Sequence, residues 1–324
     1  MIPAFQYVRV PSLEEGIRHL SSGDARVHAG GTDLLGCLRD NTFTAGKAVS
    51  ISNIQELKGI REERGGLRIG ALSTLTQVAE SPLVKKLYSG LARAASEVGS
   101  PQLRAQGTIG GNICQKPRCW YYRGDFHCIR KGGETCFAVA GENQYHCIFG
   151  GAGCHIVHPS DTAPALSALQ AAVRIIGPKG SRSVPIDQFF VPPAIDPWKE
   201  TVLEPEEIVT DISLPAPPPG LRSSYRKVRA RRSWDFALAG VALALRFDGV
   251  LVSEARVWLS GAAPVPWRSK EVEQEILGKR LDEKTIARAG AAAIKNAEPL
   301  AKNGYKIPLF KAVVEEELET MGRT

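Results

Sequence analysis

The sequence predicts an α+β protein of two or three domains, and three observations lead to this prediction. The chain has 324 residues, which is more than one hydrophobic core usually serves. Strand-like and helix-like segments alternate through the first two thirds of the chain. The proline-rich stretch APPPG at 216–220 then separates them from a segment with the pattern of an antiparallel sheet followed by helices. We therefore expect domains at 1–55, 56–215 and 221–324.

The first unit, residues 1–55, has the pattern of a small α/β unit. FQYVRV and KAVSIS are short apolar strands, and ARVHAGGTDLLGCLRD is a strand, a glycine turn and the start of a helix. PSLEEGIRHLSS predicts a helix with Ser12 as its N-cap, because Glu14 and Glu15 then lie in the first turn, where they complement the helix dipole.

The second unit alternates between the two kinds of element. Residues 67–81 predict a strand and then a helix capped by Ser73 or Thr74, and LYSGLARAASEVGS is amphipathic. DTAPALSALQAAVRIIG predicts a helix followed by a strand, and EEIVTDISLP is an alternating strand. Beyond the linker, the alternation and the Asp248-Gly249 turn predict an antiparallel sheet. Helices are then expected at 269–278, 282–296 and 311–322.

Composition limits the class of protein. Hydrophobic residues make up 43% of the chain, no apolar run reaches membrane-spanning length, and the first residues lack the pattern of a secretory signal. We therefore expect a cytoplasmic protein without a membrane span. The net charge is +7, but the basic residues are scattered and lack interleaved aromatics, so no nucleic acid is expected as a partner. The densest basic run, from Arg222 to Arg232, predicts a solvated or partner-facing surface, or a site for anionic groups.

Two short glycine segments could approach a phosphate. AGGTD at 29–33 and TIGGN at 108–112 each pair two glycines with Thr, and each follows an extended stretch. Glycine lets backbone N–H groups come close to a ligand without a Cβ in the way. Neither segment matches GxGxxG or a P-loop, so each alone is most simply a turn. Two of them in adjacent α/β units favour a shared diphosphate site.

Five of the seven cysteines fall between residues 119 and 154, at spacings of 9, 8, 11 and 7 residues. Such clustering indicates metal binding more than disulfides in a cytosolic chain. No tight CxxC pair of a structural zinc site is present, and longer spacings suit an iron–sulfur centre, although zinc or unligated thiols stay open. Cys147 lies in the apolar run YHCIF, which predicts a buried strand. The expected ligands are therefore Cys119, Cys128, Cys136 and Cys154.

Taken in order, AGGTDL, SPQLRAQGTIGGN, HPSDTAPAL and EEI-x5-LP, followed by a basic strand, resemble the flavin subunit of the molybdenum hydroxylases. That family includes xanthine dehydrogenase and carbon monoxide dehydrogenase. The resemblance covers nearly the whole chain. It implies a two-part FAD-binding domain of the PCMH (vanillyl-alcohol oxidase-like) type and a C-terminal α+β domain of the CO dehydrogenase flavoprotein type.

The resemblance also implies which residues bind FAD. The first turn would wrap the pyrophosphate, the second turn would also bind FAD, Asp161 would contact the ribityl or flavin side, Ile208 would cover the isoalloxazine, and Lys227 would approach the ring. Without the resemblance, Asp161 would be interpreted as the N-cap of the following helix, and Lys227 as a solvated lysine. The two turns comprise Val27, His28, Ala29, Gly30, Gly31, Thr32 and Asp33, and then Thr108, Gly111, Asn112 and Gln115.

The pattern RCWYYR-x4-C-x7-C, within an insertion at about 115–157, resembles a subgroup with an extra [4Fe-4S] cluster: 4-hydroxybenzoyl-CoA reductase and periplasmic-type aldehyde oxidoreductases. The resemblance implies an electron-transfer subunit with partners that carry the chemistry: a large molybdenum-cofactor subunit, a small subunit with two [2Fe-2S] clusters, and ferredoxin as electron donor. No catalytic residue is expected in this chain.

Among the members of this family, 4-hydroxybenzoyl-CoA reductase is the expected complex. An aldehyde or xanthine-type dehydrogenase is the alternative within the family. A stand-alone flavin oxidase and a zinc-stabilised nucleic-acid binder are the alternatives outside it.

Overall fold

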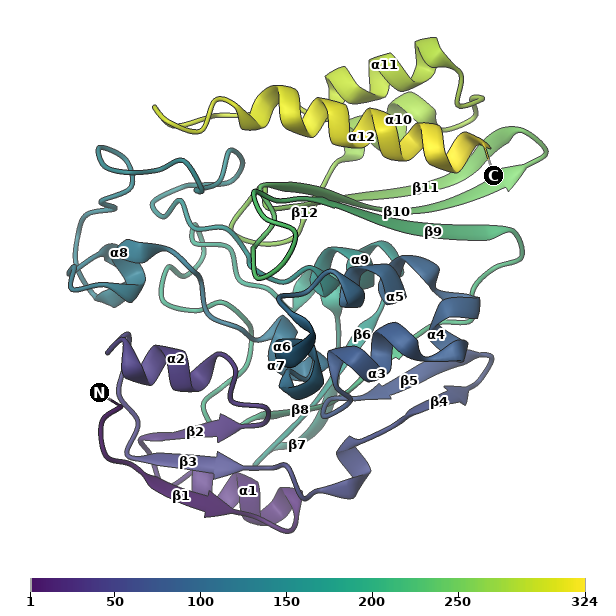
Figure 1. Cartoon of the computed structure of the whole chain (residues 1–324). Helices are drawn as coiled ribbons and strands as arrows, with labels where there is room; N and C mark the ends of the chain where they lie inside the picture. Colours follow the sequence, from purple (N-terminus) through teal and green to yellow (C-terminus); the bar gives the residue numbers. More distant parts are fainter. Residues whose placement is uncertain (1, 324) are drawn as a thin grey trace.

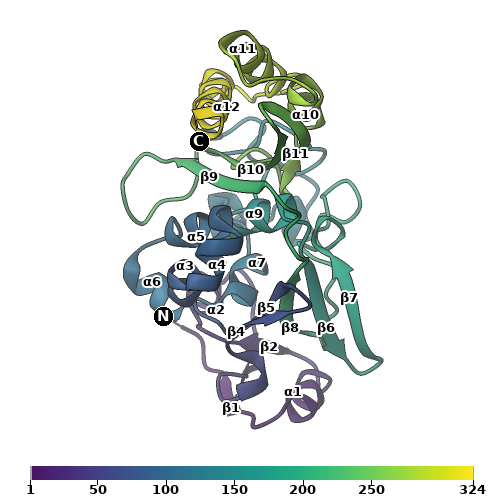
Figure 2. The ribbon, with the colours of Figure 1, turned by 90° about the vertical axis from the view of Figure 1, so that its right-hand side faces the viewer.

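The computed structural model describes residues 2–323, which form three sheets with helices packed around them (Figure 1). The N-terminal sheet lies at the bottom of this view, the C-terminal sheet lies near the top, and the middle sheet lies between them. Figure 2, turned by 90°, shows the same order along the long axis of the molecule. No helix within residues 2–323 is long and apolar enough to cross a membrane.

The N-terminal unit is a parallel three-stranded sheet in the order β1-β3-β2. Ser12 caps the first helix as expected, since its hydroxyl accepts a hydrogen bond from the backbone N–H of Glu15 at 3.3 Å. Val10, Val49 and Ile51 belong to the small core beneath this sheet. The elements are β1 (Gln6–Arg9), α1 (Leu13–Leu20), β2 (Ala25–His28), α2 (Leu34–Arg39) and β3 (Lys47–Ser50).

The middle sheet has five strands in the order β4-β5-β8-β6-β7, all paired antiparallel. Thr74 caps α3 (Leu75–Glu80) through a complete capping box with Gln77, which decides between the two expected caps. The central strand β8 is buried on both faces, although its sequence alternates. Its buried Asp211 is paired with Arg68 at 2.8 Å. The strands are β4 (Ile60–Glu63), β5 (Gly66–Gly70), β6 (Ala172–Gly177), β7 (Gly180–Pro185) and β8 (Ile208–Leu214).

Six short helices accompany this sheet. The bulk of the core formed here comes from α5, α9 and the middle sheet. The helices are α3 (Leu75–Glu80), α4 (Pro82–Leu87), α5 (Ser89–Ser96), α6 (Pro101–Gln106), α7 (Ile109–Ile113) and α9 (Thr162–Ala168).

The C-terminal unit is the expected antiparallel sheet with helices on one face, in strand order β12-β11-β10-β9. Strand β10 is buried on both faces. Val241 and Leu243 belong to the core under the C-terminal helices, while Ala242 and Ala244 belong to the core of the middle unit. The elements are β9 (Leu221–Val228), β10 (Ala239–Asp248), β11 (Leu251–Ser260), β12 (Trp267–Arg268), α10 (Lys270–Ile276), α11 (Glu283–Ala292) and α12 (Lys306–Arg323).

The insertion that carries the clustered cysteines has little secondary structure, and it forms the loops around α8 (Trp120–Arg123) in Figure 1. A single 3-10 turn, Ile129–Lys131, is its other regular element. The prediction of a strand around Cys147 was wrong, because this segment has irregular backbone. The prediction that Cys147 is buried was correct. Hydrogen bonds to the C-terminal unit hold it instead. The side chain of Asn303 donates to the carbonyl oxygens of His146 and Cys147, both at 3.0 Å.

Candidate functional site

A cavity of about 570 Å³ lies where the three units meet. The first glycine segment, the helix α7, the strand β8 and the connection between β9 and β10 all contribute to its walls. All but two of the residues expected to bind FAD line it. Those that do are Val27, Ala29, Gly30, Gly31, Thr32, Asp33, Thr108, Gly111, Asn112, Gln115, Asp161 and Ile208.

The two glycine segments are packed directly against each other. A Cβ on Gly30 would lie 2.0 Å from the carbonyl oxygen of Gln106, so only glycine permits this approach. Gly31 has a positive φ of 71°, which also favours glycine. The second segment differs from the expected turn, because residues 109–113 form the short helix α7 with Thr108 as its N-cap. The interlocked glycines create a cradle for a ligand.

The first segment presents hydrogen-bond donors to this cradle. Within the described chain, no hydrogen bond uses the backbone N–H groups of Gly31, Thr32 or Asp33. Adjacent N–H groups without partners, in a turn that includes a left-handed glycine, are suited to phosphate oxygens. The residues present therefore fit the diphosphate of a dinucleotide.

Asp33 anchors the cysteine insertion to this segment. Its carboxylate is 2.6 Å from Arg118 and 2.7 Å from Arg123, and it accepts a hydrogen bond from the backbone N–H of Lys116 at 2.7 Å. Burial alone would raise the pKa of Asp33, but the charges of Arg118 and Arg123 outweigh burial, and the pKa lies below its usual value. The carboxylate thus joins the glycine segment to the insertion, while Asp33 still lines the cavity.

A second polar cluster fixes Asn112 in the wall of the cavity. Its Oδ1 accepts hydrogen bonds from the hydroxyls of Ser160 at 2.6 Å and Thr162 at 2.7 Å. Gln115 is held as well, since its amide nitrogen donates to the carbonyl of Asn112 and its oxygen accepts from Arg118. Both predicted residues are therefore positioned by contacts within the chain.

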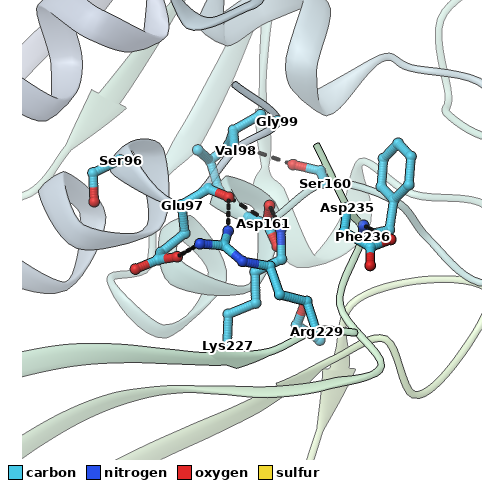
Figure 3. Close-up of polar contacts among 12 residues, drawn as sticks. Ser96, Glu97, Val98, Gly99, Ser160, Asp161, Lys227, Arg229, Asp235 and Phe236 are labelled. Carbon is cyan, nitrogen blue, oxygen red and sulfur yellow. Dashed lines mark hydrogen bonds and ion pairs between the residues drawn. The ribbon is translucent and has the colours of Figure 1, made fainter. Parts of the chain in front are cut away.

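Asp161 lines the cavity and lies next to Lys227 of β9 in the C-terminal sheet (Figure 3). Its carboxylate is 2.6 Å from the Nζ of Lys227 and accepts a hydrogen bond from the hydroxyl of Tyr225 at 2.8 Å. Burial raises the pKa of Asp161, and Lys227 and Tyr225 oppose that shift. Asp161 occupies the N-cap position of α9, but its side chain makes no capping hydrogen bond there.

Two predicted residues do not line the cavity. Lys227 lies behind Asp161, with its side chain fully buried and its Nζ also donating to the carbonyl of Glu97 at 3.1 Å. It is therefore not the solvated lysine of the basic run. The other is His28, whose ring contacts that of Tyr7 edge to face at 5.4 Å between centroids.

Sequence reasoning missed the connection between β9 and β10. Trp234, Asp235 and Phe236 from this loop line the cavity, and Figure 3 shows Asp235 and Phe236 on the side opposite Glu97. The backbone N–H of Trp234 donates to the carbonyl of Gly99, and the guanidinium of Arg118 lies 5.1 Å from the ring centroid of Phe236. Two aromatic residues directly after the basic run, Trp234 and Phe236, were the available signal.

The four cysteines chosen from the sequence all line a second cavity, which is smaller and lies inside the insertion. Cys119, Cys128, Cys136 and Cys154 all contribute to its wall, together with His146, while Cys147 does not. The sulfur of Cys147 faces His155 instead, at 3.9 Å from its Nδ1. The chain thus separates the four thiols from the fifth.

Burial controls the chemistry of these thiols. It raises the pKa of Cys119 to about 12 and raises that of Cys154, so thiolates form here only with a compensating cation. The Nε2 of His146 is 3.2 Å from the sulfur of Cys119, and burial lowers the pKa of His146 to about 4. Within residues 2–323, no group of His, Cys, Asp or Glu is arranged closely enough to hold a single metal ion.

Comparisons with known proteins agree with this architecture. Residues 3–217 match the model of the FAD binding domain in molybdopterin dehydrogenase, and residues 223–319 match the CO dehydrogenase flavoprotein C-terminal domain. The aldehyde oxidoreductase FAD-binding subunit PaoB of Escherichia coli K12 is 35% identical over 318 residues, which cover 95% of each chain. The carbon monoxide dehydrogenase medium chain of Hydrogenophaga pseudoflava is 31% identical over 92% of this chain and 88% of the relative.

Solved structures show the same fold. The carbon monoxide dehydrogenase of Hydrogenophaga pseudoflava superposes with a TM-score of 0.78 at 28% identity, over 98% of this chain and 96% of that chain. Quinoline 2-oxidoreductase from Pseudomonas putida 86 gives a TM-score of 0.79 at 24% identity, over 100% of this chain and 98% of that chain.

These matches confirm the expected fold class and the assignment of this chain as an oxidoreductase subunit that binds FAD. The chain belongs to the family of FAD-binding subunits of the molybdopterin dehydrogenases.

Proposed function

We propose that this chain is an electron-transfer subunit that binds FAD in the larger cavity and a [4Fe-4S] cluster at the four thiols. The observation that carries this proposal is the clamp at Asp33. One carboxylate belongs to the glycine segment of the larger cavity and also binds Arg118 and Arg123, which flank Cys119. The same side chain therefore fixes both sites relative to each other.

FAD supplies a carrier that can exchange one or two electrons, which suits a link between cofactors of different kinds. The chain's own residues bind and orient it. The free N–H groups of Gly31, Thr32 and Asp33 would hold the diphosphate. Ile208 would offer an apolar surface to the ring, and Asp161 would lie beside it. Lys227 would act through Asp161, because it lies behind that carboxylate.

The four thiols suit an iron–sulfur cluster better than zinc. Soft thiolates select zinc, copper(I) or iron–sulfur, and a [4Fe-4S] cluster takes four cysteines. A cluster holds its four sulfur ligands farther apart than a single ion does. Four cysteines around one cavity, without a close single-ion arrangement among the described residues, are consistent with the larger group.

The chain would work inside a complex that contains a large molybdenum-cofactor subunit and a small subunit with two [2Fe-2S] clusters. Relatives are named as medium chains or FAD-binding subunits, which supports a multi-subunit enzyme. We place oxidation of an aldehyde first among its reactions, because an aldehyde oxidoreductase subunit is 35% identical to this chain over nearly its full length.

Reductive dehydroxylation of 4-hydroxybenzoyl-CoA is the second candidate reaction, favoured by the cysteine pattern of the insertion. In that case ferredoxin would deliver electrons at the cluster. A xanthine-type dehydrogenase keeps weaker support, since the relatives with that name are 28% identical.

Purification of the native complex through a tag on this chain tests the proposal. We expect one FAD and about four irons for each copy of this chain, in addition to the iron of a small partner, together with a large partner that contains molybdenum. Assays with aldehydes and with 4-hydroxybenzoyl-CoA under reducing conditions then separate the two reactions. FAD without iron on the isolated chain would remove the cluster from the proposal, and a lone, active flavoprotein would remove the complex.

A further inference from the structure

Arg130 is a buried cation beside the cysteine cavity, and nothing in the flavin site uses it. It follows Cys128 in the 3-10 turn Ile129–Lys131 and lines the same cavity as the four thiols. Its side chain is 1% exposed, so water cannot screen its charge. A buried guanidinium remains charged at any ordinary pH.

The hydrogen bonds of Arg130 are incomplete within the chain. Its Nη2 donates to the carboxylate of Glu200 and to the carbonyl of Lys199, at 3.3 Å for the latter. Its Nε and Nη1 are buried and have no partner in the described chain. Buried donors without acceptors are unfavourable, so an acceptor at this cavity would complete the site.

The neighbouring charges leave Arg130 only partly neutralised. Glu200 binds both Arg130 and the Nζ of Lys116, so one carboxylate serves two cations. Arg130 and Cys154 line the same small cavity, so the positive charge of Arg130 lies beside the thiols. Arg130 therefore already favours negative charge on the wall of this cavity.

We propose that Arg130 is a positioning residue that sets the reduction potential of the cluster by placing a fixed positive charge and two N–H donors against its cysteine sulfurs. This inference rests on the proposed [4Fe-4S] site. A cluster with four thiolates is an anion, and reduction adds one more negative charge. Charge and hydrogen bonds to the sulfurs are known controls of cluster potential, and a cation stabilises the reduced form more than the oxidised form.

The physical consequence has a definite sign. Removing the charge of Arg130 would make the cluster harder to reduce, so its midpoint potential would move to more negative values. Keeping the charge while changing the shape of the side chain would preserve most of the potential. These two expectations distinguish electrostatic control from a purely structural role of the side chain.

The test compares Arg130→Gln and Arg130→Lys with the wild-type complex, by redox titration of the reduced cluster followed by electron paramagnetic resonance. Iron and FAD are measured on each sample. Lys131→Gln is the matched control, because it removes one positive charge from the next residue, which is half-exposed and does not line the cysteine cavity. The titration gives a potential, so its outcome does not depend on turnover.

We expect Arg130→Gln to reduce the ratio of reduced to oxidised cluster at a fixed potential by about tenfold, which is about 59 mV for a one-electron couple. Arg130→Lys and Lys131→Gln should each shift it by less than half of that. Loss of the cluster in Arg130→Gln with retention in Arg130→Lys also supports a requirement for charge.

Three results would overturn the inference. An unchanged potential in Arg130→Gln with full iron content refutes the electrostatic role. Loss of iron in both Arg130 variants shows that the side chain is structural. Absence of iron from the wild-type chain refutes the proposed cluster itself, and the iron analysis separates this failure from the first.

Discussion

Replacement of Lys227 by Met tests whether the ion pair behind the flavin cavity is as closely coupled as its geometry indicates. The Lys227 side chain is fully buried, that of Asp161 is 3% exposed, and their charged atoms are 2.6 Å apart. Methionine keeps the length and volume of the lysine stem, but it removes the charge. Among the described residues, the variant therefore leaves the buried carboxylate with the Tyr225 hydroxyl alone as a direct partner.

The expected loss of stability can be bounded from both sides. At an effective dielectric constant of about 20, two charges at this separation attract by about 6 kcal/mol, and breaking one side of a buried pair typically costs about 3 to 5 kcal/mol. Asp161 can also take up a proton. Protonation at pH 7 of a carboxyl that ionises near pH 4 when unfolded costs about 4 kcal/mol, which limits the penalty. We therefore expect Lys227→Met to lose about 3 to 4 kcal/mol.

The pH dependence gives a sharper test, because the sign is fixed. In the variant, burial without Lys227 raises the pKa of Asp161 further, so the folded chain binds a proton that the unfolded chain releases. The stability deficit then decreases as the pH falls, by about 1.4 kcal/mol per pH unit, from pH 7 toward the unfolded pKa of the carboxyl. Urea unfolding of both proteins at pH 7, 6 and 5 measures this difference.

Lys199→Met is the matched control for this experiment. Lys199 and Glu204 are also paired, at 3.0 Å, but both side chains are exposed. Exposed pairs of this kind contribute less than about 1 kcal/mol, and their loss should show no slope with pH in the same range. A deficit below 1 kcal/mol in Lys227→Met, or one that is flat between pH 7 and 5, would refute the reasoning.

Three further predictions concern other parts of the chain. Gly30→Ala should abolish FAD retention on gel filtration, since a Cβ would lie 2.0 Å from a facing backbone oxygen, whereas Gly304→Ala, with open space around it, should retain FAD. Burial lowers the pKa of His158 to about 3, so the folded chain excludes a proton that the unfolded chain binds below pH 6.5. Stability should therefore fall by about 2 kcal/mol between pH 6.5 and 5 on account of this residue, and His158→Gln should lose that part of the slope in urea titrations. Cys136→Ala should lose iron by elemental analysis, while Cys147→Ala should keep it; iron loss in the second variant alone would reverse the assignment.

Local patterns predicted a large part of the fold. Ser12 and Thr74 cap their helices because a hydroxyl three residues before a backbone N–H satisfies it whatever the tertiary context. The Asp248-Gly249 hairpin forms for a similar reason, since Gly249 adopts the positive φ that the turn requires. The four cysteines chosen from the sequence line one cavity, and Cys147 does not line it. The apolar neighbours of Cys147 were the reason for leaving it out of the choice.

Features set by distant parts of the chain were not predictable in this way. Lys227 belongs to a basic run, but pairing with Asp161, 66 residues earlier, buries it. TIGGN forms a helix rather than a turn because Thr108 caps it and its N–H groups reach Ser73 and Ala71. Trp234 lines the cavity because its loop lies against the middle unit, and the local sequence does not specify this contact. The domain boundaries remain predictions.

The attachment of the insertion to the end of the chain has a consequence for biosynthesis. Residues 143–148 are held by Glu298, Lys302, Asn303 and Tyr305, which the ribosome makes more than 140 residues later. While the nascent protein still lacks these partners, the segment with His146, which lines the cysteine cavity, lacks the contacts that hold it. Assembly of the proposed cluster would therefore wait until translation is complete, and a chain that ends before residue 298 should emerge unable to receive it.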